Sequence, residues 1–247
     1  MATIISAFIY LSTNSNTSLE SYIAHGIKLL KRDIQKIIFI DENVFAHFEE
    51  YQNAETVLIK TKLEDLYLYK YKDRLKNLRV NTNNITKDTF EYFVIQCNKT
   101  EWVREAISLH RRRALKEGDV NPIQQFIWID FGIYHVLTDD VDISTDFFKH
   151  NYDNVRIPSI WNLDITYNCD YKRDIMWYFA GGVFGGAAEK LVRFADLTKQ
   201  TCLAMIENEA HLMWEVNIWY LVWMDNKDLF NVYKATHDSS IIINYKL

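Results

Sequence analysis

Short apolar runs alternate with amphipathic stretches along the first half of the chain. Residues 2–10 are apolar and rich in β-branched side chains, and a polar segment follows them, which predicts a buried strand. Ser18 then precedes apolar residues at helical spacing and predicts a helix cap. Because parallel strands need crossover connections, this alternation predicts an α/β fold, with a mostly parallel Rossmann-like sheet flanked by helices. The predicted strands cover 2–10, 36–41, 55–61 and 125–129, and the predicted helices cover 18–32, 42–52, 63–75 and 88–117.

The second half of the chain is patterned differently. Residues 155–163 predict a further strand, and Pro158 within it indicates an edge-like or irregular position. A long amphipathic helix is predicted over 187–213, and residues 241–245 read as a strand after a polar turn. No repeat and no linker rich in Pro, Gly or Ser divides the sequence. We therefore expect one domain over 1–247, with functional halves over 1–132 and 133–247.

Composition narrows the class of protein. The chain has 247 residues, of which 49% are hydrophobic, so it can bury a substantial core. Its net charge of -5 argues against a nucleic-acid partner, which needs a basic face. Three widely spaced cysteines indicate neither a disulfide framework nor a zinc site. The longest uncharged run, 175–188, is shorter than the about 20 residues that span a bilayer, and the start lacks a basic signal-peptide region. We expect a soluble, cytoplasmic protein without a membrane span.

Residues 179–186 read FAGGVFGG and hold four of the seven glycines. Their spacing fits neither the dinucleotide-binding fingerprint nor a phosphate-binding P-loop, and the surrounding apolar run is too short for a membrane helix pair. Glycine remains useful wherever another group must lie against the backbone. Two interpretations stay open: a substrate-facing turn at Gly181 and Gly182, or tight packing at the start of the following helix.

Two further residues are candidates for metal binding. Asp130 follows the strand predicted at Gln125–Ile129, and ligands gather beyond the carboxyl ends of strands in open α/β sheets. A carboxylate there can hold Mg²⁺ or Mn²⁺, and His237, in a polar turn near the end of the chain, can complete such a site. A structural Asp and a solvated His are the alternatives. The acids at 139, 140, 142 and 146 read more simply as a solvated loop.

Three charged residues complete the candidate chemistry. Glu215 stands in an intensely aromatic stretch, where apolar surroundings favour a general acid or base, although a partly exposed acid at a helix end is the alternative. Lys99 and Arg104 belong to the helix before the Asp130 strand. They contact phosphates or form surface pairs, and spacing alone does not separate these two roles.

Taken in order, five blocks of the sequence resemble those of the WlaTC and HtrL/YibB-like glycosyltransferases, a group associated with bacterial surface polysaccharide and also found in some viruses. The blocks are KTEWVREA, FIWIDFGIYHV, FAGGVFGG, WEVNIWYLV and THDSSIIINY. The resemblance extends over almost the whole chain. It implies a GT-A fold, in which residues 1–132 bind a nucleotide-sugar and residues 133–247 bind the acceptor.

The resemblance also implies roles for single residues at the metal and the donor. An Asp-x-Asp motif normally ends the strand in this fold and binds the metal and the donor diphosphate. Here Trp128 occupies the place of the first acid, so only Asp130 matches. His237 matches the C-terminal histidine that many such enzymes add to the metal shell. Tyr10 matches the region that receives the nucleotide base.

The remaining implied roles concern sugar and catalysis. The pair Gly181 and Gly182 matches the turn that lies against donor sugar and acceptor, and Glu215 falls where inverting members place the catalytic acid or base. Lys99 and Arg104 would assist at the diphosphate. The expected activity is transfer of a hexose from a nucleotide-sugar, with UDP as the expected nucleotide, to a glycan hydroxyl, assisted by Mn²⁺ or Mg²⁺. A degenerate sugar- or nucleotide-binding module without turnover and a nucleotidyltransferase are the alternatives.

Overall fold

The structure is a computed structural model that describes residues 2–12, 18–78, 80, 82, 84, 86–118, 125–138, 141, 143 and 149–246. The described strands are β1 (Ala2–Phe8), β2 (Lys36–Asp41), β3 (Thr56–Thr61), β4 (Gln125–Ile129), β5 (Val155–Ser159), β6 (Val183–Ala187) and β7 (Phe230–Lys234). The α-helices are α1 (Leu19–Leu30), α2 (Phe90–Cys97), α3 (Lys99–Glu117), α4 (Ala188–Glu209), α5 (Glu215–Asp225) and α6 (Ser240–Ile243). Short 3₁₀ turns are η1 (Phe45–His47), η2 (Glu49–Tyr51), η3 (Leu63–Asp65), η4 (Tyr69–Tyr71), η5 (Ile133–His135), η7 (Lys227–Leu229) and η8 (Asn244–Lys246).

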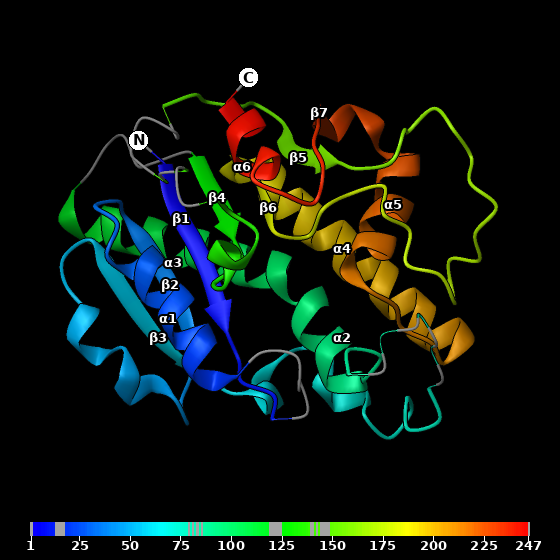
Figure 1. Cartoon of the computed structure of the whole chain (residues 1–247), viewed down its shortest axis with the longest axis horizontal. Helices are drawn as coiled ribbons and strands as arrows, with labels where there is room; N and C mark the ends of the chain where they lie inside the picture. Colours follow the sequence, from blue (N-terminus) through cyan, green and yellow to red (C-terminus); the bar gives the residue numbers. More distant parts are fainter. Residues whose placement is uncertain are drawn as a thin grey trace.

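The described strands form one seven-stranded sheet in the order β3-β2-β1-β4-β6-β5-β7 (Figure 1). Neighbours among β3, β2, β1 and β4 are parallel, as are β5 and β7, whereas β6 runs antiparallel to both β4 and β5. The α/β class and the mostly parallel sheet are therefore confirmed, and the arrangement is compatible with a Rossmann-like fold. No described helix has the length and apolar character needed to cross a bilayer.

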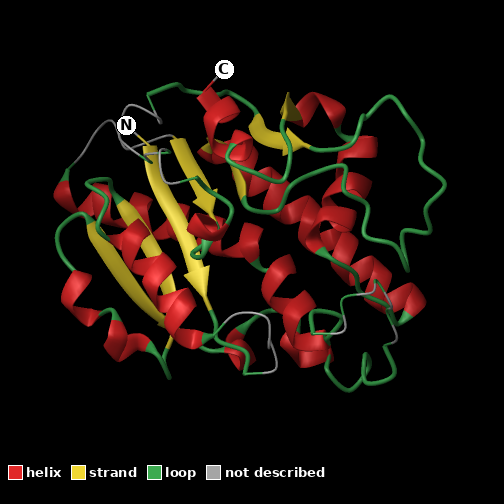
Figure 2. Ribbon diagram, viewed as in Figure 1, coloured by secondary structure: helices red, strands yellow, loops and turns green. Residues whose placement is uncertain are grey.

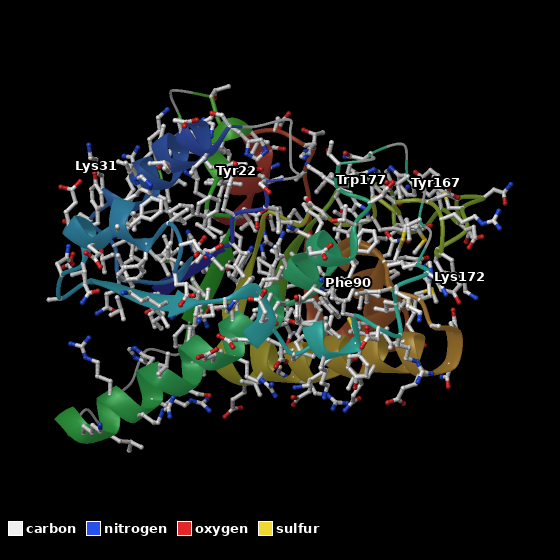
Figure 3. All side chains as sticks on the ribbon, turned by 90° about the horizontal axis from the view of Figure 1, so that it is seen from below. Tyr22, Lys31, Phe90, Tyr167, Lys172 and Trp177 are labelled. Carbon is white, nitrogen blue, oxygen red and sulfur yellow. The ribbon has the colours of Figure 1, made fainter. Side chains whose placement is uncertain are left out.

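Helices cover both faces of this sheet (Figure 2). Along β4, Phe126 and Trp128 pack into the core shared with α3 and α4, while Ile127 and Ile129 pack into the core on the opposite face. The view in Figure 3 places α3 and α4 together on one side of the sheet and α1 on the other. Strand residues alternate between two apolar layers, as expected for a sheet that is buried on both faces.

The second half of the glycine stretch is a strand. Gly185 and Gly186 belong to β6, where a Cβ on Gly185 would lie 2.8 Å from the backbone oxygen of Phe126 in the neighbouring strand. Gly186 has φ +143°, and a Cβ there would overlap the carbonyl oxygen of Asn154. Close strand packing therefore requires the second glycine pair, in agreement with the packing interpretation.

The predicted helices in the first half are shorter than expected. Residues 63–75 form the turns η3 and η4 in place of an α-helix, because Leu66 and Leu68, two positions apart, are both buried in the core. Residues 42–52 likewise form η1 and η2. The predicted helix over 88–117 is two helices separated at Asn98, and α3 ends at Gly118 with φ 71° as predicted.

Two predictions for the second half also need correction. Strand β5 is not an edge strand, because it lies between β6 and β7. Its pairing with β6 is irregular, as the alternative interpretation of Pro158 has it: the register pairs Arg156 with Gly185, and farther along the Pro158 carbonyl accepts a bond from the Ala180 amide at 3.1 Å, ahead of β6. Residues 241–245 form α6 and η8 in place of a strand. The buried Arg156 guanidinium donates to the carbonyls of Asn244 and Tyr245, at 3.1 Å each, and holds these turns against the sheet.

Candidate functional site

One edge of the sheet gathers most of the predicted site residues. Strands β1 and β4 end there, and β6 begins there because it runs antiparallel to β4. Tyr10, Asp130 and the pair Gly181 and Gly182 therefore meet at this edge. His237 joins them because β5, antiparallel to β6, carries β7 in the direction of β4. They line a cavity of about 320 Å³.

Aromatic side chains from several elements contribute to the wall of the cavity. Trp177 precedes β6 and Tyr22 belongs to α1, so the two rings approach from different parts of the chain (Figure 3). Trp177 packs edge-on against Trp214 at 6.0 Å between ring centroids, and against the exposed His237 at 5.9 Å. A concave, mostly apolar space with a few polar groups is typical of a small-molecule site.

A buried cation stands at the floor of this cavity. The Nζ atom of Lys99 lies 2.9 Å from Oε1 of Glu215, 3.0 Å from Oδ1 of Asp130 and 3.0 Å from the Gly181 carbonyl oxygen. The side chains of Lys99 and Glu215 are each 4% exposed, whereas that of Asp130 is 33% exposed. An ammonium group has three hydrogens, so these three acceptors use all of its donors.

Two helix starts bring the charges together. Lys99 is the first residue of α3, and Glu215 is the first residue of α5. The thiol of Cys97, at the end of α2, donates a hydrogen bond to the Met213 carbonyl at 3.4 Å, just before α5 begins. The Glu215 carboxylate is favoured at the positive end of its helix. The Lys99 ammonium is not favoured at such an end, so its two carboxylates have to stabilise it.

The electrostatics of the cluster follow from burial and pairing. Burial alone would lower the pKa of Lys99, but the adjacent Asp130 and Glu215 carboxylates outweigh it and hold the pKa above its ordinary value. Lys99 is therefore charged at neutral pH. With one cation and two carboxylates, the cluster carries a formal charge of one negative unit.

The two carboxylates differ in how many partners they have. Oδ1 of Asp130 accepts a second bond from the Trp128 indole nitrogen at 2.8 Å, and the Asp130 amide donates to the Gly182 carbonyl at 2.9 Å. Oε2 of Glu215, in contrast, is buried and has no hydrogen-bond partner among the described residues. Glu215 is thus held at one oxygen by Lys99 and has an unsatisfied, buried acceptor at the other.

Most predicted donor residues lie where a ligand in the cavity would meet them. Trp128 stacks between Trp102 and Phe184, lines the cavity and donates its indole N–H to Asp130. The backbone amide of Tyr10 donates to Asp41 at 3.2 Å, which fixes the chain after β1.

The first glycine pair serves the charged cluster as well as the cavity. A Cβ on Gly181 would overlap the Glu215 carboxylate and lie 3.3 Å from Nζ of Lys99. A Cβ on Gly182 would meet only side-chain atoms, the nearest being Cδ1 of Ile133 at 3.2 Å. Gly181 is therefore required for close approach inside the protein, whereas a Cβ at Gly182 would need the Ile133 side chain to move slightly at the cavity wall.

Arg104 is not part of this cavity. It pairs with Glu101, and its Nη1 lies 3.3 Å from Oδ1 of Asp196 on α4. These contacts place it at a second cavity on another side of α3. Arg104 thus forms the ion pairs that were the alternative to a phosphate contact.

The residues at the strand edge do not fit a metal site made by the protein alone. Among the described residues, no group of three or more His, Cys, Asp or Glu side chains is placed to hold a metal ion. Asp130 and Glu215 share the Lys99 ammonium, which occupies the position between them. Divalent cations such as Mg²⁺ need several oxygen ligands, so Asp130 and His237 would supply only part of a shell.

Several lining residues were not predicted. They include Lys87, Tyr92, His25 and His135. Burial lowers the pKa of His25, and the nearby His135 ring lowers it further. Lys87 precedes α2 and Tyr92 belongs to α2, and no motif distinguished them. The only available signal was the aromatic composition of that region.

Comparison of the sequence with known protein-family models and with curated proteins gives no match. Fold and site together define an α/β protein whose mostly parallel mixed sheet carries an aromatic-lined cavity at the carboxyl ends of its strands. A buried Lys–Asp–Glu cluster forms the floor of that cavity.

Proposed function

We propose that this chain is a GT-A-type glycosyltransferase that moves a hexose from a nucleotide-sugar, with UDP as the nucleotide, to a glycan hydroxyl. The observation that carries the proposal is Oε2 of Glu215, a buried carboxylate oxygen without a partner among the described residues, in a cavity walled by aromatic rings. Aromatic faces stack on sugar rings, and a carboxylate oxygen without a partner can accept a hydrogen bond from a sugar hydroxyl.

The position of Glu215 supports a role as general base. A hydroxyl of the acceptor would donate to Oε2 of Glu215 while its oxygen attacks the anomeric carbon. As the new glycosidic bond forms, the bond from that carbon to the diphosphate breaks, the nucleoside diphosphate leaves, and Glu215 takes the proton. Lys99 holds Oε1 at 2.9 Å and so fixes the direction of Oε2. This description applies to an inverting transfer.

The resemblance includes Mn²⁺ or Mg²⁺, but the protein groups around Asp130 do not by themselves fit such an ion, so no step of the proposed reaction passes through a metal. Transfer should be measured with Mn²⁺ and with a chelator. A reaction site in the cytoplasm belongs to the same proposal; Cys97, Cys169 and Cys202 are all free, which agrees with a reducing compartment.

A donor screen tests the proposal. Thermal unfolding would be followed with a panel of nucleotide-sugars, because a ligand that binds the native state raises the apparent stability. Donors that shift the midpoint would be incubated with glycan acceptors, and the products identified by mass spectrometry. A hexosylated acceptor is expected. A nucleotidylated acceptor would establish the nucleotidyltransferase, binding without turnover would establish the binding module, and no shift with any donor would overturn the proposal.

Glu215→Gln tests the base directly. The amide keeps an oxygen for Lys99 but cannot take a proton, so transfer should fall by about 10²-fold or more with donor binding retained. Glu207→Gln, at an exposed position of α4, is the matched control and should leave transfer unchanged. Undiminished transfer by Glu215→Gln would remove Glu215 from the mechanism.

A further inference from the structure

Two lysines line the cavity, and they differ in what their ammonium groups contact. Lys99 donates to three acceptors inside the protein. Lys87 has neither an ion pair nor a side-chain hydrogen bond among the described residues. Its Nζ lies over two aromatic rings, 5.7 Å from the centroid of Tyr92 and 6.0 Å from that of Trp214.

The carboxylate beside Lys87 in sequence is already engaged. Asp88 accepts the Thr82 amide at 2.7 Å and the Thr82 hydroxyl at 2.6 Å. It also accepts a longer bond, at 3.4 Å, from the Trp214 indole nitrogen. Asp88 thus orders the segment that carries Lys87, while the lysine itself turns toward the cavity.

The rings that carry the ammonium are held firmly. The Tyr92 and Trp214 ring centroids lie 5.0 Å apart, and Trp214 is only 5% exposed. A cation over two such faces is stabilised without a formal counter-charge and keeps donors for a ligand. The cavity that Glu215 lines therefore also presents a positioned ammonium group.

We propose that Lys87 is the residue that binds the phosphate groups of the ligand in this cavity, in place of Lys99 and Arg104. This assignment rests on the proposed function, in which the anion is the diphosphate of the nucleotide-sugar. A nucleoside diphosphate brings charge-accepting oxygens that a half-buried ammonium binds strongly. Burial lowers the pKa of Lys87, with Glu215 and Asp130 acting in the opposite direction, so the free site does not satisfy this ammonium fully.

Binding measurements with three probes test the assignment. Calorimetric titration would compare UDP, uridine and inorganic pyrophosphate, in a chelator so that a metal does not mask the contribution of the lysine. Wild type should bind UDP more tightly than uridine. Lys87→Met should weaken UDP about 10- to 100-fold, as expected for loss of hydrogen bonds to a charged group, and should leave uridine within about twofold. Lys87→Arg should restore most of the difference.

A matched control separates this effect from general loss of a cation. Lys72 lies over Tyr69 at 5.3 Å but outside the cavity, and Lys72→Met should bind UDP like wild type. If Lys87→Met weakens UDP and uridine equally, or neither, the assignment is wrong although the nucleotide site stands. If wild type binds pyrophosphate through Lys87 but no nucleotide, the anion site stands and the proposed transferase falls. Absence of binding by all three probes overturns both.

Discussion

Replacement of Lys99 by Met tests how much the buried Lys99–Glu215 ion pair stabilises the folded protein. Among the described residues, Lys99 is the only hydrogen-bond partner of Oε1 of Glu215, and Oε2 has none, so the variant removes the last one. A carboxylate that is 4% exposed would then lose its ion-pair partner and would have no hydrogen bond among the described residues. Met has a similar length and fills most of the space, so packing loss contributes little.

The size of the effect follows from this geometry. Removal of one partner from a buried ion pair costs about 3–5 kcal/mol, because the remaining charge stays desolvated. Asp130 adds little, since its side chain is 33% exposed and keeps the bond from Trp128. We therefore expect Lys99→Met to lower the free energy of unfolding by about 3–5 kcal/mol, a large part of the 5–15 kcal/mol that is common for a folded protein.

Urea unfolding followed by tryptophan fluorescence measures this change, with the midpoint and slope fitted together. Lys190→Met, at an exposed position of α4, should change stability by less than about 0.5 kcal/mol. The double variant Lys99→Met with Glu215→Gln removes both charges of the buried pair. It should be more stable than Lys99→Met alone by about 2 kcal/mol, because no unpaired buried charge remains.

Two outcomes would refute the reasoning. A loss below about 1 kcal/mol in Lys99→Met would mean that the pair behaves like an exposed one. A double variant less stable than Lys99→Met would mean that Glu215 is stabilised by groups other than Lys99. If Lys99→Met does not fold, the double variant alone, compared with wild type, still measures the cost of the cluster.

Three further predictions concern the glycines and the behaviour at high pH. Gly186→Ala should lower the free energy of unfolding by about 3 kcal/mol or more, since its φ is +143° and the new Cβ would overlap the Asn154 carbonyl; unchanged urea unfolding would contradict this. Gly182→Val should unfold cooperatively yet weaken donor binding about tenfold or more by thermal shift, whereas loss of the fold would assign Gly182 to packing. Burial raises the pKa of Tyr92 and of Tyr233. The stability that both residues contribute is therefore complete below the unfolded-state pKa of about 10 and is lost as the pH rises further. The urea midpoint of unfolding should be lower at about pH 11 than at about pH 8.

Much of the site could be predicted because strand ends dictate it. Tyr10, Asp130 and His237 each follow a strand whose carboxyl end reaches the same edge, and the sequence pattern located β1 and β4 correctly. The antiparallel course of β6 was not predictable from its apolar run alone. It is this reversal that brings Gly181 and Gly182 to Asp130.

The elements that differed from prediction share a physical cause. Local pattern suggested an α-helix over 63–75 and a strand over 241–245, but burial against distant elements decided both. Leu66 and Leu68 enter the core at a spacing that an α-helix does not place on one face. Near the end of the chain, Arg156 needs carbonyl acceptors, and the turns of η8 supply them where a paired strand would not.

The roles of Lys87, Lys99 and Arg104 show which part of the site the sequence alone does not predict. Lys99 and Arg104 are five positions apart on one helix, which turns them about 140° from each other, and of the two only Lys99 lines the cavity. Which of them faces the cavity, and whether its charge is free, depends on carboxylates that the chain supplies from β4 and α5. Because Lys99 is saturated by Asp130 and Glu215, a cation for a ligand has to come from elsewhere, and Lys87 is the lining lysine whose described surroundings leave its ammonium unpaired.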